Sequence, residues 1–191
     1  MFPEIAIREL VANALIHQEF RATGTSVTIE LYSDRIEISN PGKSIISPDR
    51  FIDEYESRNE KLADIMRRLG ICEEQGLGID RVIAHAEIYQ LPPPDFRVSD
   101  RHTLAIMYAH KSFDDMDAKE RVRACFQHSV LRWIMNKKMT NTTLRDRFKL
   151  PESKKEAVSR VIADAIQQGR IKPDDPSNRS RRYAKYVPYW D

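Results

Sequence analysis

The sequence has little cysteine and no long apolar run. Its two cysteines, Cys72 and Cys125, lie far apart without a Cys-x-x-Cys spacing, which argues against a disulfide framework and a zinc site. No apolar run approaches the ~20 residues that a membrane span needs, and the N-terminus lacks the charged and then apolar layout of a signal peptide. We therefore expect a cytoplasmic protein with reduced thiols, no membrane partner, no zinc and no haem.

What the sequence does have is an ordinary globular composition with an uneven distribution of charge. Hydrophobic residues make up 41% of the chain and charged residues 31%, with a net charge of +2. Residues 1–110 carry 12 Lys and Arg against 18 Asp and Glu, a balance of −6, whereas residues 111–191 carry 19 against 11, a balance of +8. This asymmetry predicts two modules with different partners, and the partner of the second, basic module is expected to be a polyanion.

Hydrophobic periodicity predicts a mixed α/β first module that ends near residue 110. The expected helices are 3–20, 59–69 and 79–89, and the expected strands are 26–32, 35–39, 95–98 and 103–109. The first two strands form a hairpin that runs into the turn tripeptide Asn40-Pro41-Gly42. Residues 43–57 have no clean period and are expected to form a loop with one short helix.

The second module is expected to have the element order of a winged helix-turn-helix. Residues 111–117 form a polar, acidic linker, and the module spans residues 118–191. Its expected helices are 118–137, 140–148 and 153–168, followed by a hairpin of 170–172 and 183–189. Thr140 or Asn141 is the expected cap of the short middle helix.

The opening helix carries a pair of polar residues with a chemically useful spacing. Glu9 and Asn13 are four residues apart and therefore share one face of a helix. A carboxylate can orient or deprotonate a water molecule, and an amide oxygen can help to hold a hard cation such as Mg²⁺. The alternative is an ordinary solvated helix face, and the spacing alone does not decide between the two.

Four stretches, in this order, resemble a family of RecG-related bacterial proteins described as transcriptional regulators or relatives of ATP-dependent helicases. The stretches are AIRELVANALIH at 6–17, ISNPG at 38–42, SRNE at 57–60 and EEQGLGI at 73–79. The family resembles a divergent branch of the Bergerat nucleotide-binding fold of gyrase, Hsp90, MutL and histidine kinases. A winged-helix tail is usual in it, and an AlbA-like or Schlafen-like domain generally comes first, so we expect a C-terminal fragment.

The resemblance implies an α+β fold, with a Bergerat-like sandwich of helices on one face of a mixed sheet over residues 1–110. It also implies ATP and Mg²⁺ as cofactors, with Glu9 as general base and Asn13 as the Mg²⁺ ligand. The implied nucleotide-binding residues are Asn13, Asn40, Gly42, Arg58, Asn59, Gly76 and Gly78. Asn40 stands where Bergerat ATPases place an adenine-binding Asp, and it can replace that carboxylate only with its oxygen turned to the base.

Two of the residues in these stretches have ordinary alternatives. Arg58 either makes a phosphate or lid contact or forms an ordinary surface ion pair, and His17 is expected to be a packing or capping residue. A true helicase is excluded, because the chain has no Gly-x-x-x-x-Gly-Lys-Ser/Thr loop and no room for two motor domains.

The basic second module is expected to bind DNA, although some winged helices bind protein instead. Its recognition helix would be 153–168, and residues 178–182, in the loop 173–182, would form its wing. The expected DNA contacts are Lys154, Lys155, Ser159, Arg160, Arg179, Arg181 and Arg182. The sequence thus favours a transcriptional regulator whose first module is a nucleotide sensor or scaffold. The alternatives are a weak Mg²⁺-dependent ATPase that acts on DNA and a degenerate scaffold that forms a homodimer.

Overall fold

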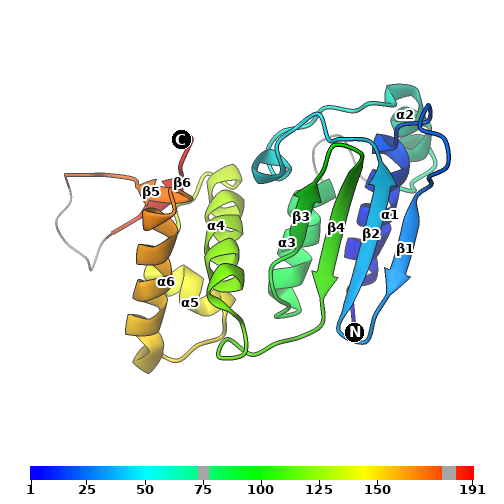
Figure 1. The fold of residues 1–191 in the computed structure, drawn as a ribbon. Coiled ribbons are helices and arrows are strands. Elements are labelled where there is room, and N and C mark those ends of the chain that lie inside the picture. Colours follow the sequence, from blue (N-terminus) through cyan, green and yellow to red (C-terminus); the bar gives the residue numbers. More distant parts are fainter. Residues whose placement is uncertain (73–77, 178–183) are drawn as a thin grey trace. The chain divides into compact units, whose positions relative to one another are not determined.

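The computed structural model describes residues 1–72, 78–177 and 184–191, and it is an α+β structure. The chain divides into two compact units, Met1–His110 and Lys111–Asp191. Each unit has its own sheet or hairpin and its own helices (Figure 1). No helix among the described residues is both long enough and apolar enough to cross a membrane.

The first unit is built on a four-stranded sheet. Its strands are β1 (Thr28–Leu31), β2 (Arg35–Pro41), β3 (Asp95–Val98) and β4 (His102–Tyr108), in the spatial order β1-β2-β4-β3. Every neighbouring pair is antiparallel, so the prediction of a mixed sheet is wrong. The reason is the connection between β2 and β3, which returns the chain so that β4 runs against β2 and pairs Asn40 with Thr103.

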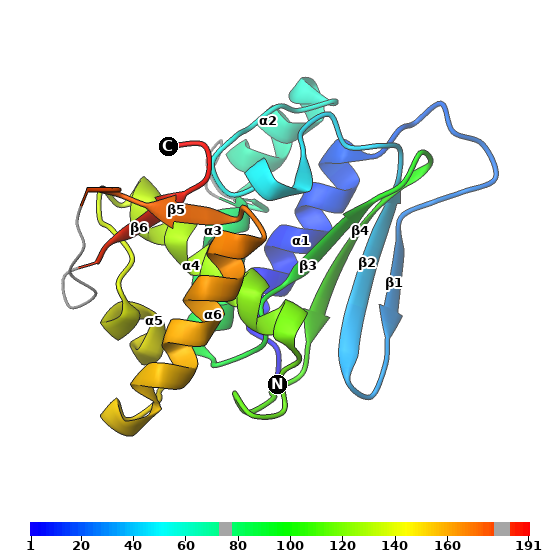
Figure 2. The same cartoon turned by 60° about the vertical axis from the view of Figure 1, so that its left-hand side comes forward.

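Helices α1 (Glu4–His17) and α3 (Gly78–Ile88) lie side by side on one face of this sheet (Figure 2). Burial of each large apolar side chain between the helices and the sheet contributes about 1.5–3 kcal/mol. The core between helices and sheet consists of Ala6, Leu10, Ala14, Ile36, Ile38, Val82, Ala86, Leu91 and Met107.

Two details of the first unit differ from the sequence pattern. Strand β1 alternates in sequence, yet all four of its residues are exposed, because it is the edge strand and lies beyond the cover of the helices. For helix α2 (Glu60–Arg68), the helical spacing of Leu62, Ile65, Met66 and Leu69 predicts one buried stripe, but Ile65 and Leu69 are 54% and 67% exposed. The helix instead buries Ala63 and Met66, which pack on α1.

Among the residues that the structure describes, the second unit has three α-helices followed by a hairpin, as expected. Helix α4 (Ala118–Ile134) begins at a capping box, and α5 (Asn141–Arg147) is capped by the Thr140 side chain. Helix α6 (Lys155–Gln167) precedes the hairpin of β5 (Ile171–Pro173) and β6 (Tyr186–Pro188). Fully buried side chains such as Val130, Leu144, Val158 and Val187 form its core.

The segment 111–117, which we expected to be a linker, packs into the second unit. Phe113 and Met116 are buried, and the ring of Phe113 meets that of Phe148 edge to face with 4.9 Å between centroids. The side chain of Arg121 also donates a hydrogen bond to the carbonyl oxygen of Phe113. The segment therefore belongs to the compact unit that begins at Lys111.

Candidate nucleotide-binding site

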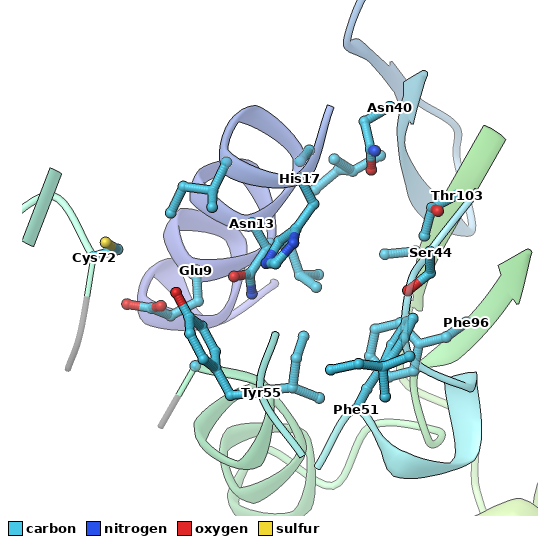
Figure 3. A pocket seen from close by; sticks show the side chains of 18 of the residues that line it. Glu9, Asn13, His17, Asn40, Ser44, Phe51, Tyr55, Cys72, Phe96 and Thr103 are labelled. Carbon is cyan, nitrogen blue, oxygen red and sulfur yellow. The ribbon is translucent and has the colours of Figure 1, made fainter. Parts of the chain in front are cut away.

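A pocket with a cavity volume of about 120 Å³ lies in the first unit (Figure 3). Helix α1 supplies one wall, the sheet supplies the second, and the chain between β2 and α2 supplies the third. Its labelled polar and aromatic lining consists of Glu9, Asn13, His17, Asn40, Ser44, Phe51, Tyr55, Phe96 and Thr103. The pocket thus collects side chains that are far apart in the sequence.

Glu9 and Asn13 both line this pocket, and Glu9 is only 1% exposed. The pair therefore does not lie on an open, solvated helix face. The amide nitrogen of Asn13 is buried and finds no hydrogen-bond acceptor among the residues that the structure describes. A buried donor without an acceptor is costly, so it is a natural contact point for a bound group.

Gly78 brings the first turn of α3 directly against this pair. A Cβ atom on Gly78 would lie 3.2 Å from Glu9 Oε2 and 3.3 Å from Asn13 Nδ2, so a larger residue would displace one of them. The first N–H groups of a helix have no partner within it, and the helix dipole favours an anion at that end. Of the predicted pair of glycines, Gly76 lies outside the described residues.

Asn40 is 5% exposed and lines the opposite side of the pocket. Its side-chain nitrogen donates to the carbonyl oxygen of Pro41 at 3.2 Å, so the amide oxygen is the atom of this side chain that can accept from a ligand. Thr103 lies directly across the sheet, and its hydroxyl donates to the carbonyl oxygen of Gly42 at 2.9 Å. These contacts join the end of β2 to β4 beside the pocket.

Aromatic side chains give the pocket an apolar wall that the sequence did not reveal. The rings of Phe51 and Phe96 meet edge to face at 5.5 Å between centroids, and Tyr55 lines the same pocket but lies nearer to Glu9 and Asn13 in Figure 3. Phe51 and Tyr55 belong to the stretch without periodicity. The position of Thr103 in the site could have been predicted, because pairing the two expected strands places it opposite Asn40.

His17 lines the pocket one helical turn beyond Asn13. Its ring meets that of Tyr55 edge to face, with 6.4 Å between centroids. Burial, and then the positive charge of Arg58, lower the pKa of His17 below its usual range. The neutral ring is therefore favoured, in keeping with a packing role.

Three of the predicted nucleotide contacts lie outside the described lining of the pocket: Gly42, Arg58 and Asn59. Arg58 donates to the carbonyl oxygen of Lys43 at 2.6 Å. Asn59 donates to the carbonyl oxygens of Ile16 and Gln18 at the end of α1. Both residues are engaged with the protein itself.

The donor atoms present fit Mg²⁺ better than a transition metal. Among the described residues no group of three or more His, Cys, Asp and Glu side chains could hold a metal ion. Mg²⁺ keeps several waters and is commonly bound by one or two protein oxygens together with phosphate oxygens. The carboxylate of Glu9 and the amide oxygen of Asn13 are donors of that kind.

In the second unit, Lys155, Ser159 and Arg160 are exposed on α6. The side chain of Asn141 donates to Ser159 Oγ at 3.0 Å and to the carbonyl oxygen of Lys155 at 3.1 Å, which joins α5 to α6. Lys154 forms an ion pair with Asp114 at 3.3 Å. The expected wing residues Arg179, Arg181 and Arg182 lie outside the described residues.

Comparison with known proteins finds a family model that matches part of the first unit. Residues 24–107 match the family described as "Putative ATP-dependent DNA helicase recG C-terminal". The DIP2311 protein from Corynebacterium diphtheriae has a similar fold, with a TM-score of 0.56 and 17% sequence identity. The similarity covers 98% of this chain but 39% of that one, so the chain spans about two fifths of its length. No curated protein matches the chain.

Proposed function

We propose, on the premise that residues 24–107 belong to the RecG C-terminal family, that the chain is a bacterial transcriptional regulator with a nucleotide sensor and a DNA-binding module. The first unit would be a divergent Bergerat-type sandwich, and the second a winged helix. Nucleotide, or another ligand in the same pocket, would bias how the basic module is presented to DNA.

The observation that carries nucleotide binding is the meeting of three separate sequence motifs in one pocket. Asn13, Asn40 and Gly78 come from α1, β2 and α3, and all three line the same cavity. In the proposed complex, the oxygen of Asn40 accepts from the amino group of adenine, and the aromatic wall contacts the ring. The first turn of α3 then faces the phosphates.

Mg²⁺ would be held by Asn13, with Glu9 nearby, and would neutralise phosphate charge. The charges of the pocket make this ion important for ATP. Arg67 is the only Lys or Arg among the described lining residues, which also include Glu9, Glu54 and Glu56. Without the metal, a triphosphate would therefore meet net repulsion in the pocket.

ATP hydrolysis is a second candidate activity, and the burial of Glu9 favours it. A carboxylate that is 1% exposed and lines the pocket can orient a water against the terminal phosphate. The test is steady release of phosphate by the chain with Mg²⁺-ATP. Release that is abolished in Glu9→Gln would support hydrolysis, and no release would leave a binding module.

DNA binding is supported by the charge of the second unit and by the exposed face of α6. Lys155, Ser159 and Arg160 lie on the N-terminal half of that helix, where recognition helices usually reach base edges. A protein partner is the alternative for this surface. Binding to duplex DNA that weakens steeply with added salt would favour DNA as the partner.

The experiment that tests the sensor is thermal unfolding with and without Mg²⁺-ATP, for the wild type and for Asn13→Ala. A ligand that binds only the folded state adds ~2.7 kcal/mol at a hundredfold excess over its dissociation constant. We expect a shift of several degrees that is lost in the variant. No shift at millimolar ATP would leave the degenerate, dimer-forming scaffold as the explanation.

A cysteine provides an independent measure of occupancy. Cys72 lines the pocket, whereas Cys125 is fully buried and its pKa is raised by that burial. Alkylation of the folded chain should therefore modify Cys72 selectively. Mg²⁺-ATP should slow this modification in the wild type and leave it unchanged in Asn13→Ala.

A further inference from the structure

One wall of the pocket is a long segment with little regular structure. Residues 43–57 contain a single short 3-10 helix, Pro48–Arg50, and they run from the end of β2 to the start of α2. The segment gives the pocket Ser44, Ile46, Phe51, Glu54, Tyr55 and Glu56. A segment this long needs specific contacts to stay in place, because ordering its backbone is costly.

Asn59 ties the far end of this segment to α1. Asn59 is the N-cap residue of α2. An Asn side chain at this position normally accepts a hydrogen bond from a backbone N–H of its own helix, but the Asn59 side chain makes no such bond. Its amide nitrogen instead donates to Ile16 O at 2.7 Å and to Gln18 O at 2.9 Å. Carbonyls in the last turn of a helix have no partner within it, so the amide completes the end of α1.

Arg58 ties the two ends of the segment to each other. Its Nη2 atom donates to the carbonyl oxygen of Lys43 at 2.6 Å, and Nη1 lies 3.8 Å from a carboxylate oxygen of Glu19. The guanidinium group fills the space beside Gly42, where a Cβ atom would collide with it. Lys43, the first residue of the segment, is thereby held to Arg58, the residue that follows the segment, and the two ends lie close together as in an Ω-loop.

We infer that Arg58 and Asn59 are positioning residues, which latch residues 43–57 over the pocket as its third wall. Both hydrogens of the Asn59 side-chain nitrogen are already committed to carbonyl oxygens of the protein. A direct phosphate contact would require breaking these bonds. The latch acts on the ligand through Phe51 and Tyr55, which the segment carries into the pocket.

The first test is hydrogen–deuterium exchange of the ligand-free chain. In Asn59→Ala, exchange of amides in 44–56 should rise by roughly tenfold, the effect of losing one or two hydrogen bonds. Arg58→Gln should give a smaller rise in amide exchange in the same peptides. This second variant keeps the test decisive if Asn59→Ala does not fold. The matched control is Asn141→Ala, which removes an amide with two bonds in the second unit. Unchanged exchange over 44–56 in both latch variants would overturn the inference.

The second test compares adenosine with Mg²⁺-ATP, and it rests on the proposed function. A latch predicts that Asn59→Ala weakens both ligands by the same factor, because the wall contacts their shared part. Weaker ATP binding with unchanged adenosine binding would instead identify a phosphate contact and overturn the inference. If neither ligand binds the wild type, the nucleotide proposal fails while the exchange experiment still decides the latch.

Discussion

Gly42 offers the sharpest test of how the pocket region is built. Its φ angle is +103°, a conformation that L side chains rarely adopt. A Cβ atom there would lie 2.9 Å from Glu19 Cβ and 3.2 Å from Arg58 Cζ, and closer still to Arg58 Nη1. The substitution Gly42→Ala therefore combines backbone strain with a steric collision.

The magnitude follows from separating these two contributions. An alanine with positive φ costs about 1–2 kcal/mol relative to glycine, and crowding in a packed site adds about 1–3 kcal/mol. We expect Gly42→Ala to lower the free energy of unfolding by about 2–5 kcal/mol. Gly24, with a φ of +73°, is the matched control, because its Cβ would meet no described atom within 4 Å. Gly24→Ala should cost only about 1–2 kcal/mol.

The assay is urea unfolding followed by far-ultraviolet circular dichroism. Tryptophan fluorescence, recorded in parallel, reports on the second unit alone, since it contains both Trp133 and Trp190. The double variant Gly42→Ala/Arg58→Ala should lose less than the sum of the single losses, because it removes the colliding side chain. The reasoning is refuted if Gly42→Ala costs no more than Gly24→Ala.

Three further predictions use other parts of the chain. Because the pKa of His17 is lowered in the folded chain, its contribution to stability is present above the ordinary value of 6.5 and is lost as the pH falls towards the folded value. Lowering the pH from about 7.5 to 5.5 should therefore destabilise the wild type more than His17→Gln, as measured by thermal unfolding. In urea unfolding, Met66→Ala should cost about 2–5 kcal/mol, whereas Leu69→Ala should change stability by less than about 0.5 kcal/mol. In DNA titrations over a salt series, Lys155→Ala and Arg160→Ala should each reduce the salt slope by about one.

The sequence predicted the secondary elements well because each has a strong local signal. The β1–β2 hairpin and the helices that became α4 and α6 follow from apolar spacing, and the Thr140 cap follows from the chemistry of its hydroxyl. The facing of α2 was wrong for a non-local reason. Its apolar residues include two overlapping stripes, and contact with Ala12 and Ile16 on α1 selects the one with Ala63 and Met66.

The candidate site was predictable only where a motif marks it. Glu9, Asn13 and Asn40 were identified in the sequence and line one pocket, although their roles there stay predictions. Phe51 and Tyr55 could not be found, because aromatic residues in an aperiodic loop carry no local signal. Their place depends on long-range closure of the chain.

That closure gives a different meaning to two of the stretches that resemble the family. The turn at 38–42 and the stretch at 57–60 were both expected to contact nucleotide, yet Gly42 and Arg58 contact each other. A residue without a side chain leaves the space that the guanidinium group occupies, and the same group reaches Lys43. The two stretches thus form one closing contact at the base of a loop. A larger residue at position 42 should be compatible with the closed pocket only when position 58 becomes smaller.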